Sequence, residues 1–242
     1  MKEFILSVAD IGFLVKPYSH DLEEYCLGYL GSDYEYEVSV TEEDIEYEND
    51  AFEEYYGYRI EDNNALEEVA LLRKVTEILS KKENTFLFHA STLVLDGYAY
   101  MFTGISGTGK TTHTKLWCKL FEDIEMLNDD KPFLKGTEDG IIVYGDPWNG
   151  KEGIGNNILA PLGGIICLKQ AEGNEIVEMS DNEKWDFIFQ QIYRSYDRES
   201  IEKCMVMVDD IIKNYPVCCL KCNTDDEAAR IAYEEIKKWR ER

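Results

Sequence analysis

A nine-residue stretch carries the clearest chemical signal in this sequence. Residues 104–112 read Gly-Ile-Ser-Gly-Thr-Gly-Lys-Thr-Thr and fit the pattern G-x-x-x-x-G-K-[ST] of a phosphate-binding loop. Glycines in such a loop let backbone N–H groups turn inward toward phosphate oxygens. We expect Lys110 to reach the β- and γ-phosphates of a nucleoside triphosphate and the Thr111 hydroxyl to hold Mg²⁺. The predicted nucleotide-binding residues are Gly104, Ser106, Gly107, Thr108, Gly109, Lys110, Thr111 and Thr112.

The segments on either side of this loop have the patterns that such a loop requires. Tyr98, Tyr100 and Phe102 alternate with smaller residues, as in a strand. Residues 112–121 carry an apolar side at helical spacing, which includes Trp117 and Leu120. A helix that begins directly after the loop adds its N-terminal partial positive charge to the anion site. The sequence therefore predicts a strand, a phosphate loop and a helix in succession.

His89 is placed near the phosphate loop by the register of a predicted hairpin. Asp96-Gly97 separates two alternating runs, residues 85–95 and 98–103, and this dipeptide favours a two-residue hairpin turn. Pairing outward from the turn sets His89 opposite Gly104, and directly opposed residues lie roughly 5 Å apart. We therefore predict that His89 lies at the rim of the phosphate site, although a lone histidine is more often structural.

Asp129 and Asp130 follow a short apolar run, residues 124–128, and are the candidate carboxylates of the site. A phosphoryl-transfer site needs a carboxylate that holds Mg²⁺ and, in a kinase, a base for the acceptor hydroxyl. We assign Mg²⁺ to Thr111 and Asp129, and the base to Asp130 by preference. Lys110 would neutralise charge that develops on the transferred group. The alternative is that Asp-Asp simply forms a turn.

Two later segments offer further candidate contacts. Residues 145–151, Gly-Asp-Pro-Trp-Asn-Gly-Lys, suit the lip of a ligand site, where Lys151 would meet phosphate, and a surface turn is the alternative. Arg194 and Arg198 lie between two predicted helices and could offer charge to a phosphate, or could form ordinary ion pairs. The last helix is expected to begin at Thr224, with Glu227 completing a capping box.

The first third of the chain is acidic and rich in tyrosine. It predicts strands at residues 4–8, 12–15 and 34–40 and an amphipathic helix over residues 64–81. Residues 41–62 combine acids with aromatics and are expected to form a solvated edge or loop, or else a docking surface for a basic substrate. We divide the chain into an N-terminal α/β subdomain, residues 1–82, and a nucleotide-binding catalytic domain, residues 83–242.

Composition narrows the classes of partner. The chain has 242 residues and a formal net charge of −24, which argues against nucleic acid and leaves a basic peptide or protein open. No stretch is long and apolar enough for a transmembrane helix, so we expect no membrane partner. The seven cysteines are odd in number and scattered, which is typical of reduced thiols. We therefore expect a cytoplasmic protein.

The sequence from residue 85 to residue 222 resembles the group that joins HPr kinase/phosphorylase to phosphoenolpyruvate carboxykinase. The resemblance rests on His89-Ala90, the glycine loop, Asp129-Asp130 and residues 145–151 and 160–165. It implies an α/β fold in which a phosphoenolpyruvate-carboxykinase-like P-loop core with a mixed sheet carries a small N-terminal α/β subdomain. It also implies that His89, Asp129 and Asp130 lie at the metal and the reacting phosphate.

The resemblance and the residues together predict an ATP-dependent kinase that uses Mg²⁺, with Mn²⁺ as an alternative. The expected acceptor is a serine-type hydroxyl of a peptide, a protein or a small metabolite. The rival prediction is a nucleotide-binding accessory protein without an acceptor. The sequence leaves open the acceptor's identity, the reverse phosphorylase reaction, GTP or pyrophosphate as donor, the oligomeric state and the pathway.

Overall fold

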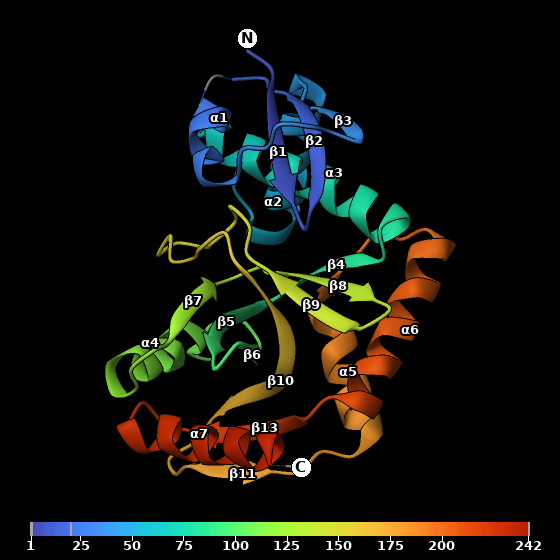
Figure 1. Cartoon of the computed structure of the whole chain (residues 1–242). Helices are drawn as coiled ribbons and strands as arrows, with labels where there is room; N and C mark the ends of the chain where they lie inside the picture. Colours follow the sequence, from blue (N-terminus) through green and yellow to red (C-terminus); the bar gives the residue numbers. More distant parts are fainter. Residues whose placement is uncertain (1, 20, 242) are drawn as a thin grey trace. The chain divides into compact units, whose positions relative to one another are not determined.

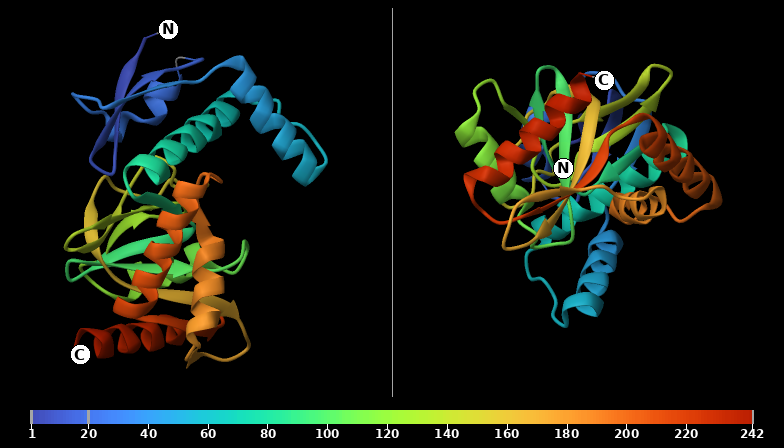
Figure 2. Two further views of the ribbon diagram at one scale, coloured as in Figure 1. Left: turned by 90° about the vertical axis from the view of Figure 1, so that its right-hand side faces the viewer. Right: turned by 90° about the horizontal axis from the view of Figure 1, so that it is seen from below.

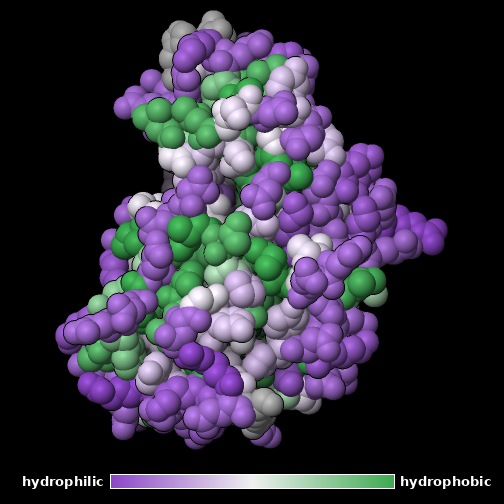
Figure 3. All heavy atoms as spheres, viewed as in Figure 1, coloured by the Kyte–Doolittle hydropathy of each residue, from purple (hydrophilic) through white to green (hydrophobic). Residues whose placement is uncertain are grey.

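The structure is a computed structural model that describes residues 2–19 and 21–241. The chain divides into two compact units, Met1–Leu79 (unit 1) and Ser80–Arg242 (unit 2). Both units combine strands and helices, so the chain is a mixed α/β protein (Figure 1). Its visible surface in Figure 3 is largely hydrophilic, in keeping with 49 acidic and 25 basic residues.

Unit 1 contains a three-stranded sheet. Strand β1 (Phe4–Val8) pairs antiparallel with β2 (Ile11–Lys16), which pairs parallel with β3 (Tyr36–Ser39). Ala9 and Asp10 join the first two strands with φ values of 53° and 63°, the left-handed conformation that a tight hairpin turn requires. The three strands predicted in this region are therefore confirmed.

The acidic run of unit 1 forms a helix, which corrects the expectation of an edge or loop. Helix α2 (Glu42–Tyr56) begins at Thr41, whose side chain accepts from the Asp44 N–H while the Asp44 carboxylate accepts from the Thr41 N–H. It ends at Gly57, which has a φ of 82°. These two caps were overlooked in the sequence. The remaining helices of this region are α1 (Asp21–Tyr25), the 3₁₀ helix η1 (Leu27–Tyr29) and α3 (Asn63–Lys82).

Unit 2 is built on a large mixed sheet with the strand order β12-β4-β8-β9-β10-β6-β5-β7, and β13 and β11 extend it beside β10. Strand β10 pairs parallel with β6 and β13 but antiparallel with β9. The strands are β4 (Thr85–Phe88), β5 (Ala90–Leu95), β6 (Tyr98–Thr103), β7 (Glu125–Asn128), β8 (Phe133–Thr137), β9 (Gly140–Tyr144), β10 (Leu159–Gln170), β11 (Glu175–Val177), β12 (Ile192–Tyr193) and β13 (Val217–Cys222).

The hairpin that leads into the glycine loop, residues 104–109, has the predicted register. Leu95 pairs with Tyr98 and Ala90 with Thr103, and the turn residues Asp96 and Gly97 have φ values of 51° and 83°. The single strand expected over residues 85–95 is wrong, because the chain breaks at His89. Before the break β4 pairs with β8 and β12, and after it β5 pairs with β6 and β7.

Helices cover both faces of this sheet (Figures 1 and 2). Alternate residues of β6 explain how: Tyr100 and Phe102 pack in one cluster with Trp117, whereas Ala99 and Met101 pack in the other. The first cluster includes α4 and α7, and the second includes α5 and α6. Their bounds are α4 (Lys110–Leu120), α5 (Asp181–Gln191), α6 (Arg198–Asn214) and α7 (Asp226–Arg240).

The start of the last helix differs from the sequence prediction. Helix α7 begins at Asp226 with Asp225 at its N-cap, and no side-chain hydrogen bond caps it. The predicted capping box of Thr224 and Glu227 is therefore wrong. The Asp225 N–H donates instead to the Asn223 side chain, and the Glu227 carboxylate accepts from Asn174. The Asp225 N–H and the Glu227 carboxylate therefore have partners other than those that a capping box provides.

Candidate functional site

The glycine loop joins β6 to α4 with the geometry of an anion cradle. Gly107 and Gly109 have φ values of 82° and 96°, a conformation that L residues rarely adopt. A Cβ at Gly104 would lie 2.7 Å from the Thr108 hydroxyl oxygen, so the loop closes tightly on itself. Because Gly109 is the N-cap of α4, the first free N–H groups of that helix lie at the loop.

Lys110 is buried at the base of the loop. Its Nζ atom lies 3.5 Å from the Gly104 carbonyl oxygen, to which it donates. Burial lowers the pKa of Lys110, whereas the nearby charges of Asp130 and Asp129 act to raise it. The ammonium group is therefore held close to both carboxylates, and an added polyphosphate would further favour its charged form.

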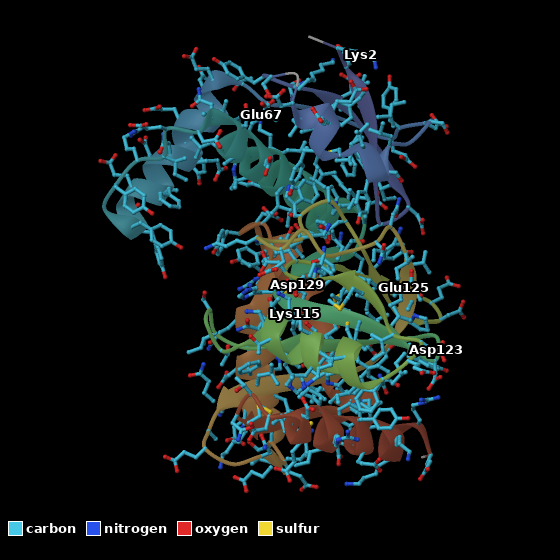
Figure 4. All side chains as sticks on the ribbon, turned by 90° about the vertical axis from the view of Figure 1, so that its left-hand side faces the viewer. Lys2, Glu67, Lys115, Asp123, Glu125 and Asp129 are labelled. Atoms are coloured by element: carbon cyan, nitrogen blue, oxygen red, sulfur yellow. The ribbon has the colours of Figure 1, made fainter. Side chains whose placement is uncertain are left out.

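Asp129 is fixed by hydroxyl groups from two other elements. Its Oδ2 atom accepts from Thr111 at 3.1 Å and its Oδ1 atom accepts from Ser91 at 2.6 Å. Ser91 lies on β5, and Thr114 on α4 lies 2.9 Å from its hydroxyl. Burial raises the pKa of Asp129, and the hydrogen bonds from Ser91 and Thr111 oppose that rise. Figure 4 shows Asp129 beside Lys115, whose charge also acts on this carboxyl group.

Asp130 lies between a histidine and a lysine. The Nε2 atom of His89 is 3.5 Å from its Oδ1 atom, and Lys131 donates to its Oδ2 atom. Burial alone would raise the pKa of Asp130, but His89 and Lys131 outweigh it and bring the pKa to about 2. The backbone N–H of His89 donates to the backbone carbonyl of Gln191 at 2.9 Å, which fixes the chain between the end of β4 and the start of β5. Asp130 is thus a carboxylate at every physiological pH.

Asn128 connects the aspartate pair to the glycine-rich loop of residues 145–151. This fully buried side chain accepts from the N–H groups of Asp130 at 2.8 Å and Lys131 at 2.7 Å. Its amide nitrogen lies 3.5 Å from the Asp146 carbonyl oxygen. One side chain therefore shapes the turn that carries Asp129 and Asp130 and holds it beside the loop.

The loop of residues 145–151 contacts Asp130 directly. A Cβ at Gly150 would lie 2.9 Å from the Asp130 Cβ, so only glycine fits at this approach. Asp146 is fully buried, and one of its oxygens accepts from the Trp148 N–H at 2.9 Å. Its other oxygen has no hydrogen-bond partner among residues 2–19 and 21–241, and burial raises its pKa well above the usual value. This loop forms one wall of the site.

A pocket of about 360 Å³ lies on the other side of the glycine loop. It is lined by Ile105 and Gly107 of the loop, Leu168 and Gln170 of β10, and Phe187 of α5. Gln170 donates to the Gly107 carbonyl at 3.1 Å, which ties this pocket to the loop. Because β6 stands between β10 and β5 in the sheet, the pocket and the aspartate pair lie on opposite sides of the strand that carries the loop.

The structure brings together the four residues predicted to act in chemistry, Lys110, Asp129, Asp130 and His89. It gives other surroundings to the two arginines: Arg194 donates to the Phe189 and Ile192 carbonyls, and Arg198 pairs with Glu202. His113 is buried and accepts from the Trp117 indole, and burial lowers its pKa to about 3.

Several residues of the site were missed in the sequence. Lys151 is exposed, and the lysine beside Asp130 is Lys131, which a search for charge next to the aspartate pair would have found. Ser91 and Asn128 carried no signal of their own, because the pairing of β5 with β7 that aligns Thr92 with Asn128 is not encoded in a local motif. These residues became visible only in the folded chain.

Two features are absent from the part of the chain that the structure describes. Among the described residues, no group of three or more histidine, cysteine, aspartate or glutamate side chains is placed to hold a metal ion. A P-loop magnesium ion, however, takes only one or two protein ligands and completes its shell with phosphate and water. Across the same residues, no helix combines the length and apolarity needed to cross a bilayer.

Comparison with known proteins finds similarity to solved structures but not to known sequences. No protein-family profile and no curated protein matches the sequence. The chain is similar to the structure of the HPr(Ser) kinase/phosphatase from Coxiella burnetii, with 12% sequence identity and a TM-score of 0.35. The match covers 64% of this chain and 94% of that one. At this level of similarity it assigns no residue and no activity.

Proposed function

We propose that the protein is an ATP-dependent kinase that transfers the γ-phosphoryl group to a serine-type hydroxyl of a peptide, a protein or a small metabolite. The observation that carries the proposal is the junction of a phosphate cradle with two differently held carboxylates. Asp129 contacts the P-loop hydroxyl of Thr111 at 3.1 Å, while Asp130 lies 3.5 Å from His89. A protein that only binds nucleotide needs the first contact and not the second.

Thr111 and Asp129 fit the protein share of a magnesium site. A hydroxyl and a carboxylate in contact at the N-terminus of α4 are the donor types that P-loop proteins offer to Mg²⁺. Ser91 holds the other oxygen of Asp129, which fixes the carboxylate for this task. When bound, the ion would screen the negative charge of the β- and γ-phosphates.

Asp130 is the proposed base. The acceptor oxygen attacks the γ-phosphorus, the bond from that phosphorus to the bridging oxygen breaks, and ADP leaves. The hydroxyl proton passes to the Asp130 carboxylate, which is ionised at neutral pH because His89 and Lys131 lower its pKa to about 2 against the effect of burial. Lys110 and the free N–H groups of the loop neutralise the charge that develops on the transferred group.

The pocket beside β10 suits the base of the nucleotide. Its walls include Leu168 and Phe187, and aromatic and aliphatic side chains favour a flat purine ring. It lies across β6 from Asp129 and Asp130, so a nucleotide along the loop would have its base at one end and its reacting phosphate at the other. This arrangement supports a nucleoside triphosphate over free pyrophosphate as the donor.

The test is transfer of label from ATP that carries ³²P at the γ-position. Heat-inactivated cell extract, divided by ultrafiltration into macromolecules and small molecules, serves as the acceptor. We expect label in an acid-stable ester in one fraction with the wild type and none with Lys110→Ala. Binding of ATP without transfer to either fraction would contradict the kinase and leave a nucleotide-binding accessory protein as the alternative.

A further inference from the structure

The end of helix α2 exposes a cluster of aromatic side chains, which we call the aromatic end: Phe52, Tyr55, Tyr56 and Tyr58. Tyr55 is 80% exposed, Tyr56 57% and Tyr58 60%. The rings contact one another, with centroids 4.3 Å apart for Phe52 and Tyr56 and 4.6 Å apart for Tyr55 and Tyr56. Contiguous exposed aromatic groups are unusual on a surface and commonly mark an interaction site.

The aromatic end is not needed to attach α2 to unit 1. Within α2 the buried residues are Ile45 and Asn49, both before the last two turns. The first half is also held by ion pairs, since Lys74 and Arg73 both contact Asp44 and Arg73 contacts Glu48. The C-terminal turns project away from the three-stranded sheet of the same unit (Figure 2). The four aromatic side chains therefore need another explanation than packing.

The charge around the aromatic end is strongly negative. Helix α2 carries acidic side chains from Glu42 to Glu54 and no basic one. Glu53 and Glu54 stand in its last turn, where the helix dipole is already negative and a cation would be favoured. Arg59 pairs with Glu53 and offsets part of this charge, whereas Glu54 is exposed beside the aromatic end. Charge complementarity therefore points to a cationic partner.

The same helix already shows how it binds arginine. Arg59 donates to the carboxylates of Glu46 at 2.6 Å, Asp50 at 2.7 Å and Glu53 at 3.1 Å. Arg73 places its guanidinium carbon 4.7 Å from the centre of the Tyr47 ring while it bonds to Glu48. Carboxylates and a ring face thus act together on one guanidinium, and a planar guanidinium exploits both better than an ammonium group does.

We propose that the aromatic end of α2, with Glu54 beside it, is a docking surface for an arginine-rich peptide segment of a partner protein. Acidic side chains alone would serve solubility, but they do not account for three exposed tyrosines that contact one another or the half-buried Phe52. A second copy of this chain would bring an equally acidic helix to the surface, and anionic lipid would be repelled. The proposal does not depend on phosphoryl transfer.

The probe is a fluorescein-labelled peptide in which arginines alternate with glycine and serine. Its counterpart has citrulline, which is neutral and nearly the same shape, at every arginine, and a third peptide has lysine. Fluorescence anisotropy at about 50 mM NaCl, where surface charge is weakly screened, measures binding. We expect the arginine peptide to bind at least about tenfold more tightly than the citrulline peptide and about threefold more tightly than the lysine peptide.

Variants separate the aromatic end from the overall charge. Tyr55→Ser with Tyr56→Ser keeps the charge and should weaken binding about tenfold, while Tyr55→Phe with Tyr56→Phe keeps the rings and should bind within about twofold of wild type. Tyr34→Ser with Tyr98→Ser removes two other exposed tyrosines as the matched control. Glu54→Gln should weaken binding, and Glu234→Gln on α7 should not.

Either of two binding results would overturn the proposal. Either the arginine peptide fails to bind the wild type, or Tyr55→Ser with Tyr56→Ser binds it as tightly as the wild type does, so that general negative charge explains the attraction. Both tyrosines are exposed, so unfolding is not expected, and circular dichroism checks the helix. Sedimentation shows whether the substitutions alter self-association, and dissociation of a dimer by them would overturn the proposal in favour of a second copy as the occupant.

Discussion

The aspartate pair of unit 2 and the acidic helix of unit 1 use the same kind of side chain in opposite ways. Asp129 and Asp130 are held by hydroxyl, imidazole and ammonium groups from several elements, and their pKa values move apart, the first raised by burial and the second lowered to about 2. On α2, Glu54 and its neighbours stand in solvent. Adjacent carboxylates with separated pKa values suit division of labour in catalysis, whereas exposed acids suit recognition.

The largest expected effect comes from Lys110→Ala. This substitution removes the buried cation at the base of the glycine loop, and we expect phosphoryl transfer to fall below detection. Lys119→Ala is the matched control, because Lys119 lies on the same helix and pairs with Asp226 at the surface. The control should retain transfer within about twofold of wild type. Equal loss in both variants would show that the helix, rather than the loop lysine, is what matters.

Asp130→Asn tests the division of labour between the two carboxylates. We expect transfer to fall by roughly 10²- to 10⁴-fold with little change in ATP affinity, since the base is lost and the cradle is kept. Asp129→Asn should instead weaken the binding of Mg²⁺, so that transfer requires a higher Mg²⁺ concentration. Because the pKa of Asp130 is lowered to about 2, this carboxylate is still ionised at pH 5. Any loss of activity near pH 5 should therefore arise from other groups. Wild-type turnover in Asp130→Asn would remove it as the base.

Asn128→Ala tests how strongly the turn that carries the aspartate pair depends on the Asn128 side chain. The N–H groups of Asp130 and Lys131 would lose their acceptor, and the Asp146 carbonyl would lose its donor. We expect a loss of about 1–3 kcal/mol in unfolding free energy, together with a fall in transfer. Asn128→Asp keeps the acceptor for both N–H groups and should recover part of both. Equal stability of wild type and Asn128→Ala in urea would contradict this role.

Much of the site could be predicted from the sequence because its signals are local. The glycine loop reads as a motif, and the Asp-Gly turn sets the register of β5 and β6 by counting. The residues that escaped prediction depend on pairing between distant segments. Ser91 reaches Asp129 only because β5 lies beside β7, and His89 meets Asp130 only because the strand breaks before Ala90.

The fold, like the site, could be predicted only where the sequence carries a local signal that was recognised. The alternating strands of unit 1 and the helix over residues 64–81 could be foreseen, and α3 spans Asn63–Lys82. Helix α2 was missed because its sequence has no continuous apolar face, and its caps at Thr41 and Gly57 provide the local signal instead. An acidic helix whose exposed end is aromatic does not follow the usual amphipathic pattern.

Asp146→Asn should change how stability depends on pH. Burial raises the folded pKa of Asp146 well above its ordinary value of 3.8, so the folded chain keeps a proton that the unfolded chain releases. Its contribution is therefore fully present below about pH 4 and is lost as the pH rises toward the folded pKa. We expect the unfolding free energy of Asp146→Asn to fall less with rising pH than that of the wild type does. The stability of the variant relative to the wild type should therefore increase from acid to alkaline pH. A pH-independent difference would contradict the buried proton.

The smallest effect is expected at the start of α2. Thr41→Ala removes the side chain that accepts from the Asp44 N–H and should cost about 1 kcal/mol of stability. Because α2 carries the proposed docking surface and contributes no residue to the proposed nucleotide site, ATP affinity should not change. Thermal melting and nucleotide titration of the same sample measure both quantities. Weaker ATP binding in Thr41→Ala would contradict the proposal that the two acidic regions have separate functions.

The most direct test of the central claim is isothermal titration calorimetry of ATP into the full chain, with Mg²⁺ and with excess chelator. The account predicts one site whose affinity depends on Mg²⁺, is lost in Lys110→Ala and is kept in Lys119→Ala. Parallel titrations with GTP and pyrophosphate identify the donor. Absence of binding for all three ligands, or equal binding by wild type and Lys110→Ala, would contradict a nucleotide site at this loop.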